Sequence, residues 1–220
     1  MLRSNDGRYN VYVHRVSSKD VIVMSKKVIV TDCDGVLLDW EEGFAVWMEH
    51  NGHDMVPDGK LIYNIAERYG MEYEKGKQLV KQFNQSAAMG FLPPLRDAQY
   101  YVKLLSEKHQ YKFLVLTSLS LDPYAKMLRE RNLTKIFGDC FTDVICLDTG
   151  ADKDDDLAVL AKKYSGHWWI EDKPANVVAG CEAGFRSILI EHGHNMNHEF
   201  DNGLDVTVAK TWEEIYDIVR

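Results

Sequence analysis

The amino-acid sequence predicts an α/β protein with a Rossmann-like, three-layer arrangement, in which helices cover both faces of a parallel sheet. Short β-branched apolar runs, typical of buried parallel strands, alternate with segments that carry apolar residues at helical spacing. One interval, residues 39–92, shows helical patterns and no strand pattern. The length of 220 residues fits one domain that carries such an insertion.

The alternation of strands and helices can be followed along most of the chain. The apolar runs that predict strands are 28–31, 113–116, 144–147, 168–170 and 187–190. The helices predicted between them are 95–109, 123–132, 157–164 and 175–183. The second of these helices follows Asp122, a good N-cap, and has Pro123 at its first position.

The interval 39–92 predicts a small helical cap inserted in the core after the first strand, with helices at 40–50, 59–69 and 73–87. An insertion at this point lies above the carboxyl ends of the strands, where open α/β sheets bind ligands. The core then comprises residues 25–38 and 93–220. Residues 1–24 are predicted to be a loosely attached N-terminal extension, with a hairpin of 9–13 and 20–23 as the alternative.

Composition and charge limit the classes of function. The 26 Lys and Arg against 34 Asp and Glu give a net charge of −8, and no basic cluster is present, which argues against binding of duplex nucleic acid. No apolar run approaches the roughly 18–20 residues that a membrane span needs. The four cysteines lack CxxC spacing, which is typical of a cytoplasmic protein. Monomer and homodimer both stay open.

Two acidic residues follow the first predicted strand directly, in the sequence Asp32-Cys33-Asp34-Gly35. Two carboxylates so close at the end of a buried strand are costly unless a positive charge lies between them. Mg²⁺ supplies such a charge, because it binds one or two carboxylates together with phosphate and water. The alternative interpretation is an ordinary turn with Asp-x-Asp-Gly composition.

With these residues the chain resembles the haloacid-dehalogenase-like superfamily of phosphohydrolases, whose first motif, DxDGxxxD, follows a strand. The apolar run 113–116 leads into Thr117-Ser118, as the second motif requires. Lys153 lies ahead of a predicted helix, where the third motif places its lysine. The run 168–170 ends in two acids, as the fourth motif does. The resemblance covers residues 28 to about 190 and implies the fold predicted above.

The resemblance also implies catalytic roles for residues at these motif positions. Asp32 would be the nucleophile that forms an aspartyl-phosphate, and Asp34 would act in turn as general acid and general base. Thr117 and Lys153 would donate hydrogen bonds to the phosphoryl oxygens. The predicted activity is a magnesium-dependent phosphomonoester hydrolase that acts on a small phosphorylated substrate.

The same resemblance implies a magnesium site. Asp32, the main-chain carbonyl of Asp34 and the side chain of Asp172 would bind Mg²⁺, with Glu171 as an outer or water-mediated ligand. The run of acids from Asp152 to Asp156, beside Lys153, has a simpler alternative interpretation, since acids are favoured at a helix start.

Within the superfamily the chain is most similar to the 5′(3′)-deoxyribonucleotidases, which share the acidic opening that runs on to Phe44, the pair Thr117-Ser118 and a Gly-Phe-Leu segment like 90–92. This resemblance implies a nucleoside monophosphate as substrate, with Phe44 stacking on the base, Trp47 widening that wall and Ser118 in the substrate site. Packing of the cap is the alternative role for Phe44 and Trp47. Glu171 departs from the family, which has aspartate there.

Two other functions stay open at this point. A phosphatase of another small metabolite, such as a sugar phosphate, would use the same residues under a different cap. A non-catalytic binding module would keep the fold without the chemistry. His192, His194 and His198 could form a metal-binding tract, but no cysteine or acid completes a set with them, and we expect a solvated loop.

Overall fold

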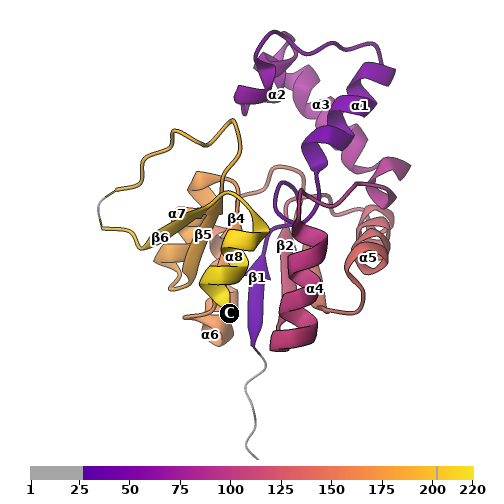
Figure 1. Ribbon diagram of the computed structural model, residues 1–220. Helices are drawn as coiled ribbons and strands as arrows, with labels where there is room; N and C mark the ends of the chain where they lie inside the picture. Colours follow the sequence, from indigo (N-terminus) through magenta and orange to yellow (C-terminus); the bar gives the residue numbers. More distant parts are fainter. Residues whose placement is uncertain (1–26, 202) are drawn as a thin grey trace, which may run out of the picture.

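The computed structural model describes residues 27–201 and 203–220 (Figure 1). The predicted N-terminal extension and its possible hairpin lie outside the described residues. We call residues 39–92 the cap and the other described residues the core. This division stays a prediction, although the described elements between residues 39 and 92 are all helices: α1 (Trp40–His50), η1 (Gly59–Leu61), α2 (Ile65–Arg68), α3 (Tyr73–Asn84) and η2 (Ala87–Gly90).

The core contains a parallel sheet of six strands in the order β3-β2-β1-β4-β5-β6, which confirms the predicted fold class. The five predicted strands are present with small differences at their ends, and a sixth was not predicted, because its four residues are only partly buried at the sheet edge. The strands are β1 (Val28–Thr31), β2 (Lys112–Thr117), β3 (Phe141–Cys146), β4 (Trp168–Glu171), β5 (Arg186–Ile190) and β6 (Val206–Ala209).

Alternation of side chains along the buried strands produces two apolar layers, one on each face of the sheet. Ile29 belongs to the layer under α4, α5 and α8, whereas Val28 and Val30 belong to the layer under α6 and α7. Figure 1 shows α4 and α8 side by side on the first face. These helices are α4 (Ala98–His109), α5 (Pro123–Phe137), α6 (Asp154–Tyr164), α7 (Pro174–Glu182) and α8 (Trp212–Val219).

Helices α1, α2 and α3 stand above the carboxyl ends of the strands (Figure 1). Helix α1 begins where Asp39 accepts a hydrogen bond from the amide of Glu42. The single helix predicted at 59–69 is wrong in detail, because the chain forms two short helices there. Asn64 separates them: its side chain caps the amide of Ala66, so that a new helix begins at residue 65.

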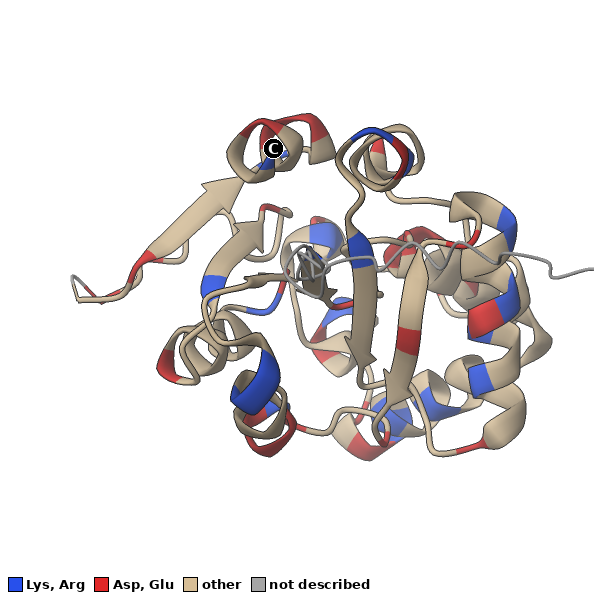
Figure 2. Ribbon diagram, turned by 90° about the horizontal axis from the view of Figure 1, so that it is seen from below, with Lys and Arg blue, Asp and Glu red and all other residues tan. Residues whose placement is uncertain are grey.

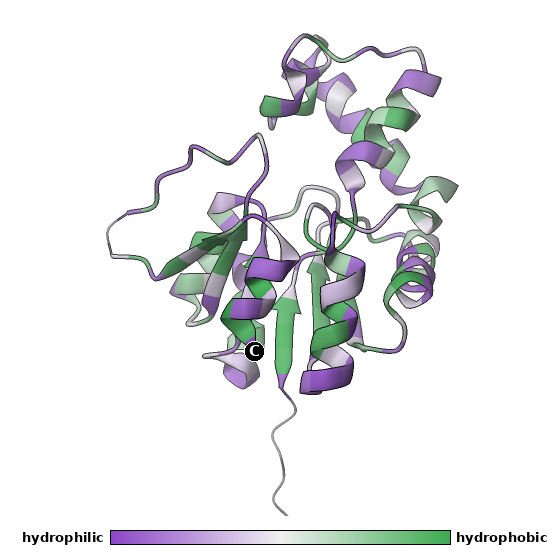
Figure 3. Ribbon diagram, viewed as in Figure 1, coloured by the Kyte–Doolittle hydropathy of each residue, from purple (hydrophilic) through white to green (hydrophobic). Residues whose placement is uncertain are grey.

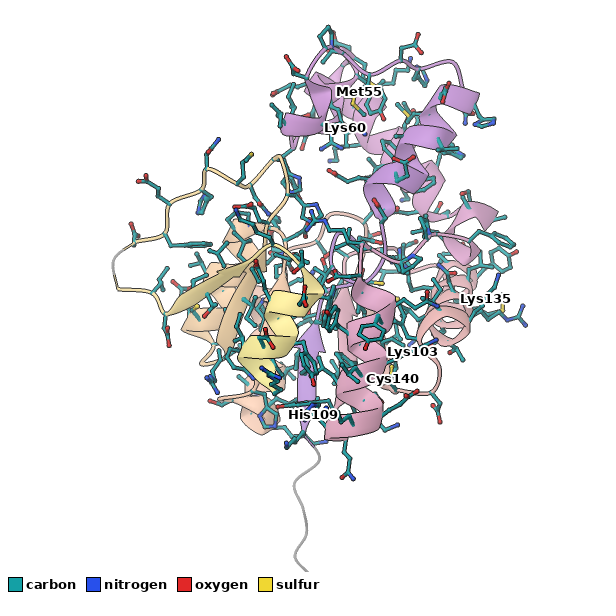
Figure 4. All side chains as sticks on the ribbon, in the orientation of Figure 1. Met55, Lys60, Lys103, His109, Lys135 and Cys140 are labelled. Carbon is teal, nitrogen blue, oxygen red and sulfur yellow. The ribbon has the colours of Figure 1, made fainter. Side chains whose placement is uncertain are left out.

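The colouring by residue type follows this layered arrangement. The strands are apolar, and the segment between β5 and β6 is largely hydrophilic (Figure 3). Acidic and basic residues are mixed along the helices around the sheet and are rare on the strands (Figure 2). His109 and Cys140 lie toward the end of the core opposite the cap (Figure 4). Within the described part of the chain, no helix has the length and apolarity needed to cross a bilayer.

Candidate active site

The register of the three central strands brings the predicted motif residues to one place. Thr31, the last residue of β1, pairs with Val115 of β2 on one side and with Ile170 of β4 on the other. The residues that follow, Asp32 and Asp172, therefore emerge together at the carboxyl edge of the sheet. They line a cavity of about 830 Å³ between this edge and the cap.

Lys153 lies at the centre of the site and is almost completely buried. Its ammonium group forms an ion pair with Oδ2 of Asp32 at 2.8 Å and donates a hydrogen bond to Oε2 of Glu171 at 2.7 Å. The position follows from the sequence, because residue 153 is the N-cap of α6 and directly precedes its first turn. One buried cation therefore serves two buried carboxylates, an arrangement that is costly to disturb.

Glu171 is fully buried, and its side chain holds the neighbouring chain in place. Its Oε1 accepts from the amides of Asp172 and Lys173, both at 3.0 Å. Its Oε2 accepts from Lys153 and, at 3.1 Å, from the side chain of Asn176. Both oxygens are thus engaged with protein donors, and Glu171 acts here mainly to orient Lys153 and the loop that carries Asp172.

The residues present fit a divalent cation. Asp32, Glu171 and Asp172 each place a carboxylate oxygen within 4.8 Å of the others. Oδ1 of Asp32 is buried and has no hydrogen-bond partner among the described residues, so it is available as a ligand. A set of carboxylate oxygens is the donor type that Mg²⁺ prefers. The side chain of Asp34 lies outside this set.

The pKa values of the site reflect the crowding of acids. Burial raises the pKa of Asp32 to about 7, the charge of Glu171 adds to this, and Lys153 opposes it. Burial together with the charges of Glu171 and Asp32 also holds the pKa of Asp172 well above its usual range. Burial alone would lower the pKa of Lys153, but the carboxylates of Asp32 and Glu171 hold it above its ordinary value.

These shifts predict how a cation stabilises the protein at different pH. Because the folded-state pKa of Asp32 is raised from 3.8 to about 7, stability that is present at low pH is lost as the pH rises toward and through 7. A cation that binds the ionised carboxylates removes this loss. We therefore expect Mg²⁺ to raise the thermal unfolding midpoint more at pH 8 than at pH 5.5.

The measurement compares Mg²⁺ with EDTA at each pH by differential scanning calorimetry. The comparison at constant pH cancels the effect of groups whose titration does not depend on the cation. An Asp172→Asn variant is the matched control and should lose most of the pH-dependent increment. If Mg²⁺ raises the thermal unfolding midpoint equally at both pH values, the assignment of the carboxylates as the cation site is contradicted.

Asn195 and Trp212, which sequence analysis missed, help to fix the loops after β1 and β4. Gly35 has a φ of +71°, and a Cβ there would lie 2.5 Å from Oδ2 of Asp172, so a larger residue is excluded. The ring of His192 contacts the carbonyl of Gly35 at 2.7 Å. Asn195 donates to the carbonyl of Asp172 at 2.6 Å, and Trp212 donates to that of Val36 at 2.7 Å. These contacts join the β1 and β4 loops to the C-terminal part of the chain.

The expectation of a solvated loop is wrong for His192, which is buried, and for His194, whose side chain is only 3% exposed; of the three histidines only His198 is exposed. His194 lies between the cap and the core, with its ring nitrogens 3.4 Å from Glu41 and 3.6 Å from Asp172. It also stacks on His192. The spacing of the histidines could have suggested burial, but their acidic neighbours come from distant segments that sequence alone does not bring together.

The carboxylate of Asp34 forms an ion pair with the fully buried guanidinium of Arg129 in α5. Two guanidinium nitrogens of Arg129 donate to this carboxylate: Nη1 donates to Oδ1 of Asp34, and Nη2 donates to Oδ2 at 3.1 Å. Arg129 also donates to the sulfur atoms of Cys33 and Met89. Sequence analysis did not single out Arg129, because an arginine in an amphipathic helix normally faces solvent.

Thr117, the last residue of β2, and Ser118, which follows it, both line the cavity. Thr117 is fully buried, and its Oγ1 has no hydrogen-bond partner among the described residues. Ser118 donates from its hydroxyl to the carbonyl of Ala151 at 2.7 Å. Thr117 therefore has a free donor at the cavity, while Ser118 tethers the loop that precedes Lys153.

The structure does not bring Phe44 and Trp47 to the cavity. The side chain of Phe44 is fully buried in the cap, where it stacks on Trp40 at 4.6 Å between ring centroids and packs against Phe83. Trp47 packs against the same cluster. This matches the packing alternative, because both side chains sit on the inner side of α1. The cap aromatics that line the cavity are Trp40, Tyr63 and Tyr73.

No protein-family model matches the sequence. A curated relative, an uncharacterized 32.4 kDa protein encoded between Gp30 and rIII of Enterobacteria phage T4, is 28% identical over 154 residues. The match covers 67% of this chain and 54% of the phage protein, so the chain spans about half the length of that relative.

Solved structures resemble the fold at low sequence identity. A haloacid dehalogenase-like hydrolase from Streptococcus pneumoniae has a TM-score of 0.62 at 12% identity, covering 88% of this chain and 98% of its own. The L-2-haloacid dehalogenase from Xanthobacter autotrophicus has a TM-score of 0.59 at 13% identity, with the same coverage. The D,D-heptose 1,7-bisphosphate phosphatase from B. bronchiseptica, solved with magnesium and phosphate, has a TM-score of 0.53 at 10% identity, covering 87% and 97%. The chain therefore has the haloacid-dehalogenase-like fold.

Proposed function

We propose that this protein is a divalent-cation-dependent phosphomonoester hydrolase that acts through an aspartyl-phosphate on Asp32. The observation that carries the proposal is the environment of Asp32, which lines the cavity. One of its oxygens has no hydrogen-bond partner within the described part of the chain, and Lys153 lies 2.8 Å from the other. The free hydroxyl of Thr117 lies at the same cavity and supplies a donor for a phosphoryl oxygen. Several neighbours with the same fold are phosphatases or other hydrolases by name, which supports this class of reaction.

The chemistry proceeds in two displacements. An oxygen of Asp32 forms a bond to phosphorus as the bond from phosphorus to the substrate oxygen breaks, and Asp34 gives its proton to that oxygen. Water then forms the new bond to phosphorus and transfers a proton to Asp34, while the bond to Asp32 breaks and orthophosphate leaves. Because Arg129 binds the carboxylate of Asp34 in this structure, proton donation requires that ion pair to open when substrate enters.

Asp32 and Asp172 would hold the cation, with the carbonyl of Asp34 as a further ligand and Glu171 in the outer shell. A bound Mg²⁺ would neutralise negative charge on the phosphoryl oxygens. Lys153 keeps its proton beside Asp32 and donates toward the same oxygens, since its two carboxylate neighbours hold its pKa high. The structure of a neighbour with magnesium and phosphate supports this choice of cation.

Among substrates, the proposal is a nucleoside monophosphate. The cavity of about 830 Å³ lies in the range typical of small-molecule sites and exceeds what a phosphoryl group needs. Trp40, Tyr63 and Tyr73 offer aromatic surface on the cap side, in place of Phe44, for contact with a base. A sugar phosphate is the second candidate, because the polar cap residues of the same cavity, Asn64 and Gln78, could bind hydroxyl groups.

Hydrolysis of p-nitrophenyl phosphate tests the reaction class. We expect turnover with Mg²⁺ and loss of turnover in excess EDTA that is restored by added Mg²⁺. A panel of deoxynucleoside monophosphates and sugar phosphates then ranks the substrates by kcat/KM. Absence of turnover on every ester would favour a non-catalytic binding module, and sugar phosphates that exceed nucleotides would reject the nucleotidase proposal.

A further inference from the structure

Helix α3 of the cap presents two lysines to the cavity. Lys77 and Lys81 both line it, and their spacing of four residues places them one turn apart on the same face of the helix. Lys75, on the same helix, does not line the cavity. Glu74, about one turn before Lys77, also lines the cavity, so α3 contributes two positive charges and one negative charge to this wall.

The other cations that line the cavity are engaged with carboxylates. Lys153 lies between Asp32 and Glu171, Arg68 binds Glu41 at 2.8 Å, and Lys173 lies 3.5 Å from Asp152. Within residues 27–201 and 203–220, neither Lys77 nor Lys81 has a carboxylate oxygen within 4 Å of its ammonium group.

Two like charges at this spacing repel each other and destabilise a helix slightly. The ammonium group of Lys77 is 5.5 Å from the ring centroid of Tyr73, a weak cation–π contact that leaves its hydrogen-bond donors free. An anion bound between the two lysines would remove the repulsion and use those donors. The protein as a whole is acidic, with a net charge of −8, so this pair is a local exception on the wall of the cavity.

We propose that the substrate carries a second anionic group, a phosphate or a carboxylate, which Lys77 and Lys81 bind while the scissile phosphate lies at Asp32. This inference rests on the proposed phosphatase activity and specifies the substrate class for the same site. The cavity has room for a molecule with charged groups at both ends. The scissile phosphate uses Lys153 and the cation, so the lysines of α3 are left to recognise the distal group.

Matched substrate pairs test the inference. Each pair differs in one anionic group: a deoxynucleoside 5′-monophosphate against its 3′,5′-bisphosphate, a hexose 6-phosphate against the 1,6-bisphosphate, and a hexose 6-phosphate against the corresponding 6-phosphohexonate. We expect kcat/KM to be about tenfold higher for the doubly anionic member of at least one pair, mainly through a lower KM. Whether the preference appears in the bisphosphate pairs or in the phosphohexonate pair identifies the second anionic group as a phosphate or a carboxylate.

The variant Lys77→Gln/Lys81→Gln should remove most of this preference within the pair, and Lys75→Gln should keep it. Raising the salt concentration should weaken the preference in the wild-type protein. Hydrolysis of p-nitrophenyl phosphate, measured on the same preparations, separates the two levels of the proposal. If the wild-type protein does not hydrolyse p-nitrophenyl phosphate, the proposed phosphatase activity is refuted. Turnover without any preference for double anions, or an equal loss of preference in Lys75→Gln, would overturn the inference about the lysines alone.

Discussion

Replacement of Asp32 by asparagine is expected to lower phosphatase turnover by about 10⁴-fold or more, because the substitution removes the oxygen nucleophile. The amide is isosteric with the carboxylate and removes a buried negative charge whose pKa is already raised by burial and by Glu171. The fold should therefore survive, and the free energy of unfolding without metal should be unchanged or higher at pH 8. Steady-state hydrolysis of p-nitrophenyl phosphate and urea unfolding measure the two quantities.

Trapping of the covalent intermediate makes the same test specific. Acid quenching of the wild-type protein during turnover, followed by mass spectrometry, should find a phosphoryl group on the peptide that contains Asp32, and none in Asp32→Asn. Asp148→Asn is the matched control, since Asp148 also lines the cavity but lies outside the proposed chemistry. Turnover of Asp32→Asn near the wild-type rate would refute the aspartyl-phosphate mechanism.

Replacement of Lys153 by methionine is expected to destabilise the folded protein by about 3–5 kcal/mol at pH 8 in EDTA, because it leaves Asp32 and Glu171 buried without a cation. The cost should shrink as the pH falls toward 5.5, since Asp32, with a pKa raised to about 7 even beside Lys153, becomes protonated there. Urea unfolding at the two pH values measures the difference. Turnover should be lost at both.

The double variant Lys153→Met/Glu171→Gln separates the effect of the Glu171 charge from the effect of the hydrogen bonds that Glu171 accepts. Removing the second charge should restore part of the stability at pH 8, although the new amide side chain can no longer accept every hydrogen bond that Glu171 accepts. If the double variant is less stable than Lys153→Met, the hydrogen bonds that Glu171 accepts contribute more to stability than the removal of its charge does. A stability of Lys153→Met equal to the wild type would contradict the burial of the lysine between two acids.

The layered fold could be predicted from the sequence because its signals are local. Runs such as 28–31 are β-branched and apolar, and α1 begins at the acid that caps it. Tertiary context decided the weaker elements. The edge strand Val206–Ala209 is short and partly exposed, so its residues show little of the pattern of a buried strand. Helix α8 has a strong apolar face but was not predicted, although Trp212 packs in the core and donates to the loop after β1.

The candidate site divides in a similar way. The positions of Asp32, Thr117, Lys153 and Asp172 at strand ends and a helix start follow from local sequence, because parallel strands bring their carboxyl ends to one edge. The partners of these residues do not follow from it. The ion pair of Asp34 with Arg129 joins side chains 95 residues apart in sequence, a distance over which periodicity carries no information.

The sequence by itself determined five of the six strands in their order along the chain and the residues at the sheet edge, because hydrophobic period and strand-end position are local properties. Only the tertiary structure decided which side chains of α1 line the cavity. Phe44 and Trp47 pack inside the cap, whereas Trp40 reaches the cavity. It also decided that His194 is buried between cap and core. Whether a side chain is buried and whether it lines the cavity depend on how distant segments pack together, and that packing is a property of the whole chain.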